Sequence, residues 1–184
     1  DRWARVPNES AKSQKKLLGL QRIAEIWAFA GRAGDLCVAL PAATSGTVEL
    51  CRGNEVTQYF QTNVQRLESV SVLWGTYYRE NAGTVSMELL RTDTDQVLMS
   101  GQFDAATIPE GGTTTLYAEQ PLEDLPGVEL ALRITADSRE GSAVSPLMDG
   151  SNGAVGGLVL NGQQAVGRLC FSTAGTDFIR AGQH

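Results

Sequence analysis

The sequence predicts a mostly-β protein, an antiparallel β-sandwich or jelly roll with an N-terminal amphipathic helix. Three observations support this fold class. Apolar and polar residues alternate with a period of two after Cys37, which is typical of strands with one buried face. Twenty glycines are spread along 184 residues, as a fold with many turns requires. Before Cys37 the apolar period is instead three to four residues, which indicates a helix.

The predicted helix covers residues 10–31. Ser10 is a plausible N-cap, and Gly31 or Gly34 follows the last periodic position. We therefore predict a helical arm over residues 1–35 and a sandwich domain over 36–184. The apolar stripe of the helix consists of Leu17, Leu20, Ile23, Ala24, Trp27 and Ala30.

Three segments show the strand alternation most clearly, namely residues 70–75, 84–89 and 130–135. Asn81-Ala82-Gly83 lies between the first two and predicts a hairpin connection there. Further strands are expected at residues 47–52, 57–62, 96–103, 113–118, 143–147, 156–161 and 167–172.

Charge is unevenly distributed along the chain. Residues 1–34 hold seven basic and three acidic residues, whereas the other 150 hold eight basic and eighteen acidic ones. An acidic main body argues against nucleic-acid binding, because phosphate contacts need a basic face. No stretch of the sequence approaches the roughly 20 apolar residues of a membrane-spanning helix. Since the sequence begins at Asp1, we expect an excised part of a larger protein, with any anchor or catalytic domain elsewhere in that protein.

Catalytic and metal-binding signals are weak. The only histidine is His184, the last residue, which is either native or a remnant of a tag. A nucleophile–histidine site and a zinc site are therefore not expected. Paired carboxylates of a glycoside hydrolase remain a third, less favoured alternative; the candidates are Glu68, Glu80, Glu88 and Glu129. We predict no cofactor, although segments 93–95 and 149–152 supply oxygen ligands that a structural calcium ion accepts.

Three cysteines are too few for a disulfide scaffold. If residues 36–40 and 47–51 form a hairpin, Cys37 and Cys51 face each other and form a candidate disulfide in an oxidising compartment. Cys170 is a rival partner, and three unpaired buried thiols are the other alternative.

An aromatic and polar cluster is the main candidate binding site. Trp74, Tyr77 and Tyr78 are followed closely by Arg79 and Asn81. Aromatic faces stack on sugar rings, and Arg and Asn donate hydrogen bonds to hydroxyls. The structural alternative is that Trp74 belongs to the core and that Arg79 and Asn81 serve the turn, Arg79 by binding a carbonyl or carboxylate.

The same region resembles a known type of module. The motifs concerned are Gln58-x-Phe60, Leu67-x-x-Val70-x-Val72-x-Trp74, Thr76-Tyr77-x-Arg79-x-Asn81-x-Gly83, Val85-x-Met87-x-Leu89 and Ala143-Val144. Together they resemble those of carbohydrate-binding-like, galactose-binding-like jelly-roll modules from extracytoplasmic parts of bacterial membrane proteins, such as membrane glycosyltransferases. The resemblance covers residues 45–175.

The resemblance implies a non-catalytic module whose concave sheet or loop rim meets a cell-surface glycan. It places the module outside the cytoplasm, in a protein whose membrane segments lie beyond this chain. Tyr77, Arg79 and Asn81 are then the expected ligand-binding residues. The main alternative is a structural or assembly domain that docks on a partner through the helix over residues 10–31.

Overall fold

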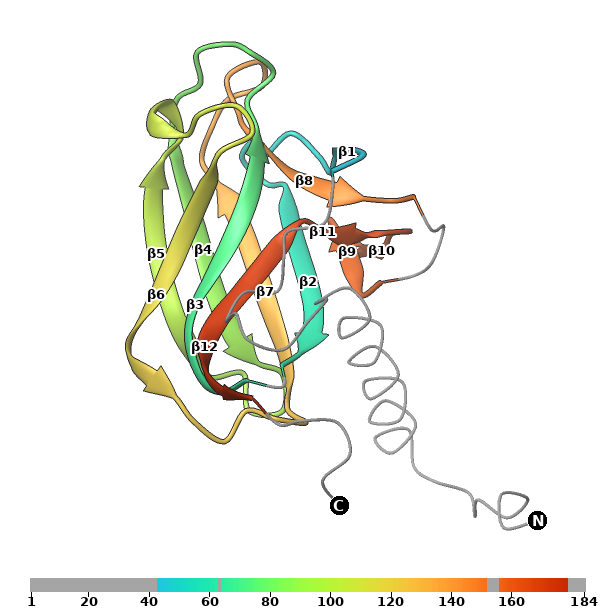
Figure 1. Ribbon diagram of the computed structural model, residues 1–184. Coiled ribbons are helices and arrows are strands. Elements are labelled where there is room, and N and C mark those ends of the chain that lie inside the picture. Colours follow the sequence, from blue (N-terminus) through green and yellow to red (C-terminus); the bar gives the residue numbers. More distant parts are fainter. Residues whose placement is uncertain (1–42, 63, 152–155, 179–184) are drawn as a thin grey trace, which may run out of the picture.

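The structure is a computed structural model that describes residues 43–62, 64–151 and 156–178. These residues form two antiparallel β-sheets that face each other (Figure 1), which confirms the mostly-β, sandwich-like prediction. The predicted helical arm, its alternative docking role and the boundary at residue 36 all lie outside the described residues. Within the described ranges, no helix has the length and apolar character needed to cross a membrane.

The first sheet is built around the long strand β3 (Val64–Gly75). On one side β3 pairs with β6 (Thr113–Leu122), and on the other with β12 (Phe171–Phe178). Beyond the start of β12, the last two residues of β3 pair with β8 (Ser145–Asp149). The short strands β1 (Ser45–Gly46) and β11 (Arg168–Leu169) also pair with β8.

The second sheet has the order β10-β9-β2-β7-β4-β5. A short 3₁₀ helix, Ala105–Thr107, follows β5. The strands of this sheet are β2 (Glu55–Gln61), β4 (Thr84–Arg91), β5 (Val97–Asp104), β7 (Glu129–Ala136), β9 (Leu158–Leu160) and β10 (Gln163–Gln164).

The core lies between the sheets because alternate residues of the central strands point inward. Apolar side chains fill most of it, including Trp74, which is completely buried as the structural alternative predicts. One buried polar side chain also joins the sheets: Gln58 of β2 accepts from Leu169 N of β11 at 2.8 Å. The central core side chains are Val70, Val72 and Trp74 of β3, Val85, Met87 and Leu89 of β4, and Leu130, Leu132 and Ile134 of β7.

Two predictions about the strands were wrong. Asn81-Ala82-Gly83 does not close a hairpin, because β3 and β4 belong to opposite sheets and pair with other strands. The apolar faces of β3 and β4 instead face each other across the core. The predicted strand over residues 47–52 is only an extended segment: Leu50 N donates to Val144 O at 2.9 Å, and Cys51 forms an isolated bridge with Ser138.

Candidate functional site

The candidate site is the loop over residues 76–83, which crosses from β3 to β4 at the top of the sandwich (Figure 1). Tyr77 and Tyr78 both have left-handed backbones, with φ angles of 58° and 53°. Bulky L-residues rarely adopt this conformation, and each instance costs on the order of 1 kcal/mol or more. Two in succession persist only where surrounding contacts fix the loop.

One of these contacts comes from Glu110, which lies ahead of β6. Its carboxylate accepts from Thr76 N at 2.5 Å and from Thr76 Oγ1 at 2.7 Å. These bonds stabilise the charged form and hold the pKa of Glu110 below its usual range, with smaller contributions from the amides of Tyr78 and Tyr77. A single carboxylate thus fixes the start of the turn.

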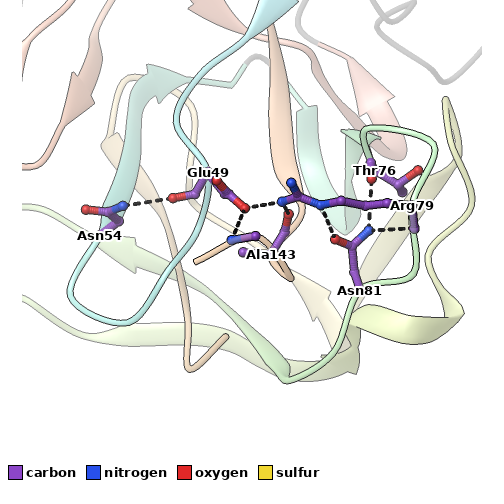
Figure 2. Close-up of polar contacts among 7 residues, drawn as sticks. Glu49, Asn54, Thr76, Arg79, Asn81 and Ala143 are labelled. Carbon is purple, nitrogen blue, oxygen red and sulfur yellow. Dashed lines mark hydrogen bonds and ion pairs between the residues drawn. The ribbon is translucent and has the colours of Figure 1, made fainter. Parts of the chain in front are cut away.

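Arg79 fixes the other side of the loop (Figure 2). Its Nη2 forms an ion pair with the Glu49 carboxylate and also donates to Ala143 O at 3.0 Å. Its Nε donates to Asn81 Oδ1 at 3.3 Å. As the structural alternative predicts, Arg79 therefore binds both a carboxylate and a carbonyl.

Asn81 completes the network from within the loop. Its Nδ2 donates to Thr76 O at 3.0 Å and to Arg79 O at 3.2 Å, and its side chain is buried. With Oδ1 accepting from Arg79, both ends of the amide are engaged inside the protein. The predicted contact between Asn81 and a ligand stays a prediction, and the contacts described here are those of a turn-stabilising residue.

Glu49 links this network to two neighbouring segments. Besides pairing with Arg79, its carboxylate accepts from Gly141 N at 3.0 Å, and its backbone carbonyl accepts from Asn54 Nδ2 at 2.8 Å. Figure 2 shows the resulting chain of contacts from Asn54 through Glu49 and Arg79 to Asn81. Three loops of the same end of the sandwich are thereby held together.

The network leaves two aromatic side chains in solvent. Tyr77 is 49% exposed and Tyr78 is 89% exposed, although large aromatic side chains are usually buried. The Arg79 guanidinium lies over the Tyr77 ring, with Cζ at 4.6 Å from the ring centroid. We call Tyr77 and Tyr78 the tyrosine tip, and the loop over residues 76–83 that carries them the tip loop. Chemically, the tyrosine tip offers aromatic faces and phenol hydroxyls on a fixed backbone.

The candidate catalytic glutamates either bind other side chains of the protein or lie on different elements. Glu88 forms an ion pair with Arg133 at 2.5 Å, and Glu129 accepts from Thr92 Oγ1 at 3.0 Å. Glu68 and Glu80 are exposed on β3 and on the tip loop, and so belong to different elements.

The candidate calcium segments form local turn contacts. Asp93 pairs with Arg91 at 2.9 Å, and Asp149 accepts from Ser151 N at 2.9 Å. Hydrogen bonds from the side chain and the amide of Ser151 lower the pKa of Asp149. In the described part of the chain, no group of three or more His, Cys, Asp or Glu residues is arranged to hold a metal ion.

Two of the three cysteines, Cys51 and Cys170, are described, and no disulfide joins them. Cys170 is buried, and burial raises its pKa to about 11. The rival pairing of Cys170 with Cys51 is wrong, whereas its pairing with Cys37 is not tested. Cys37 lies outside the described residues, so the Cys37–Cys51 bond stays a prediction.

Sequence reasoning missed Glu49 and Glu110, the two carboxylates that fix the loop. They lie 30 and 34 residues from their partners, and no periodic signal connects residues at such separations. The Ala143-Val144 motif was the one sequence signal for the neighbouring loop, since Ala143 supplies the carbonyl that Arg79 binds.

Comparison with known proteins adds no assignment. The chain matches no protein-family model, and it matches no curated protein.

Proposed function

We propose that this chain is a non-catalytic, carbohydrate-binding module whose tyrosine tip contacts a glycan. The observation that carries the proposal is the pair of exposed tyrosines on a doubly left-handed backbone that two carboxylates hold in place. Strained backbone maintained by surrounding contacts is concentrated at binding and catalytic sites. A rigid aromatic surface also loses little conformational entropy when a ligand stacks on it.

In this proposal the tip residues have different roles. Tyr77 and Tyr78 stack on sugar rings through the ring faces that remain exposed, and their hydroxyls exchange hydrogen bonds with the sugar. Arg79 and Asn81 are positioning residues, because their described polar contacts lie within the protein. Arg79 also orients the Tyr77 ring from one side.

The arrangement of strands supports the jelly-roll part of the proposal. In the first sheet β1, β8, β3 and β6 are successive neighbours, with β12 also paired along β3, and in the second sheet β2, β7, β4 and β5 are successive neighbours. Two interlocked four-strand sets of this kind are the pattern of a jelly roll, an architecture that lectin domains use. Fold alone does not determine function, so the proposed glycan binding rests on the tyrosine tip and not on the sandwich.

The resemblance noted in the sequence supplies the proposed setting. We infer an extracytoplasmic module in a larger, membrane-attached protein of a bacterium, where cell-surface polysaccharide is the accessible glycan. The chain would then retain or orient polysaccharide while another part of the protein performs any chemistry.

A titration of the whole chain with a panel of bacterial and plant oligosaccharides tests the proposal. We expect one or more neutral oligosaccharides to bind, and Tyr77→Ala and Tyr78→Ala each to weaken binding. The loss of an aromatic contact is worth about 1 kcal/mol, or roughly five-fold in Kd. Isothermal titration calorimetry and glycan-array signals provide the measurement.

Tyr117→Ala is the matched control, because Tyr117 is 72% exposed on β6, away from the tip. Its affinity should equal that of the unaltered chain. The proposal fails if no sugar binds, or if all three alanine variants bind equally well.

A further inference from the structure

A second surface of the molecule, distinct from the tyrosine tip, has the form of a ligand site. The outer face of the second sheet carries an open groove of about 690 Å³, within the range of known ligand sites. Its floor includes Ala131 of β7, whose small side chain leaves space between Tyr59 of β2 and Leu90 of β4, its two neighbours across the strands. The tip loop contributes no residue to this groove.

The groove has a definite length. Glu55 begins β2 at one end, and Glu129 lies opposite Gln61, the last residue of β2, at the other. Six residues of an extended strand span about 20 Å. That separation is too long for the two carboxylates of a glycoside hydrolase, which lie roughly 5–10 Å apart. An extended ligand, lying along the strands, fits the groove best.

The charge of the groove is uncompensated and negative. Each lining arginine already has a carboxylate partner: Arg133 pairs with Glu88, and Arg91 pairs with Asp93. This leaves the lining acids Glu55, Asp95 and Glu129 without an ion-pair partner in the described part of the chain. The hydrogen bonds that Arg133 donates to Glu88 raise the pKa of Arg133, and the charges of Glu88, Glu55 and Asp95 add to this effect.

An unused acceptor lies near the same face. Gln61 Oε1 is buried and has no hydrogen-bond partner among the described residues, and Gln61 follows Thr57 and Tyr59 on the outward positions of β2. Its neighbour across the strands is Glu129. An acceptor beside an unpaired carboxylate favours a ligand that brings N–H donors and positive charge.

Neutral polar groups alternate with these acids along the groove. Thr57, Thr92 and Gln164 line it together with the Tyr59 side chain. Hydroxyl and amide groups of this kind exchange hydrogen bonds with a ligand rich in hydroxyls. Thr57 donates to Glu55 at 3.2 Å and Thr92 donates to Glu129 at 3.0 Å, so the oxygens of both hydroxyls still accept from a ligand.

We propose that this groove binds a linear glycan whose sugars carry free amino groups, such as a polymer of unsubstituted amino sugars. Its ammonium groups meet Glu55, Glu129 and Asp95, and its hydroxyls meet the neutral side chains between them. Anionic glycans are disfavoured because like charges repel in the groove. The site is independent of the tyrosine tip.

The test is a calorimetric titration of the whole chain with an oligomer of β-1,4-linked glucosamine at mildly acidic pH. Parallel titrations use its fully N-acetylated counterpart, a uronic acid oligomer and an oligolysine peptide. We expect the glucosamine oligomer to bind about ten-fold more tightly than the N-acetylated one, as a few partly exposed ion pairs provide. Added salt should reduce this preference.

Charge-neutral variants locate the site. Glu55→Gln and Glu129→Gln should each weaken binding of the glucosamine oligomer several-fold, while Glu68→Gln, an equal charge change at an exposed position on β3, should not. Thermal unfolding shows whether each variant is folded. The salt dependence of oligomer binding by the unaltered chain tests the role of charge without any variant.

Three outcomes would overturn the inference. Equal affinity for the amino and N-acetylated oligomers would remove the role of charge. Tighter binding of oligolysine would make the groove a site for a cationic peptide. A groove that binds none of the four ligands would end the proposal, whatever the tyrosine tip binds.

Discussion

Trp74 is the largest fully buried side chain of the core, and its one polar atom has a partner. Its Nε1 donates to Thr114 Oγ1 of β6 at 2.8 Å, and this hydroxyl in turn donates to Met87 Sδ of β4 at 3.3 Å. A single threonine thus satisfies the indole and connects the two sheets. Buried polar groups without such partners are strongly destabilising.

Thr114→Val tests this contact, because it keeps the shape of the side chain and removes the hydroxyl. The indole N–H is then buried without an acceptor, and the free energy of unfolding should fall by about 1–3 kcal/mol. Urea denaturation measures the change. Thr113→Val, at an exposed neighbouring position, should alter stability by less than about 0.5 kcal/mol. Equal stability of the two variants would contradict the role of Thr114.

Glu110 makes the tip loop sensitive to acid. Since the folded protein lowers the pKa of Glu110, the stabilisation is present above the carboxyl's ordinary pKa of about 4.3 and disappears as the pH falls through the lower folded value. Glu110→Gln should therefore be less stable than the unaltered chain at neutral pH, and the difference should vanish in strong acid. Thermal unfolding across that pH range provides the measurement. A difference that persists when both side chains are uncharged would show that the charge is not responsible.

The strands could be predicted well from alternation, but their partners could not. The alternating runs 70–74, 85–89 and 130–134 all lie in observed strands. Alternation shows that a strand has one buried face, yet it does not say which sheet that strand joins. The loop over residues 76–83 therefore looked like a hairpin, although the strands on either side of it face each other across the core.

The candidate site was predictable to the same partial degree. The cluster of Tyr77, Arg79 and Asn81 is visible in the sequence, and the structure brings the three together. The partners that decide their roles come from residues 30 to 64 positions away, namely Glu49, Glu110 and Ala143. Only the folded chain places those groups beside the loop.

β12 contains a bulge where the register with β3 shifts between Ala174 and Gly175. A Cβ atom added at Gly175 would collide with the backbone carbonyl of Arg66 and with the Val64 side chain. The glycine is required there because the two backbones approach closely at the bulge.

Gly175→Ala should therefore lower the free energy of unfolding by about 2 kcal/mol or more, because the backbone carbonyl cannot move aside cheaply. Chemical denaturation measures the loss. Gly150→Ala is the control, since a Cβ there meets only ordinary contacts. If Gly175→Ala is as stable as this control, the close approach at the bulge is not a constraint.

Across the whole molecule, the two proposed binding surfaces are held in place by different parts of the structure. The tyrosine tip is held by loops at one end of the sandwich, whereas the groove lies on the outer face of the second sheet. A change at one surface should therefore leave the structure of the other intact. Distant sites without shared partners usually behave additively.

The path of β3 determines how the sandwich would carry a mechanical load. β3 runs up to the tip loop, and its antiparallel partner β12 runs down to the opposite end of the sandwich (Figure 1). The two strands pair from Phe171 beside Val72 to Phe178 beside Val64, with the bulge between. Tension between a polymer held at the tip and the chain leaving β12 would slide these strands past each other. Because the hydrogen bonds between antiparallel strands lie across that direction, they would resist together and not one after another.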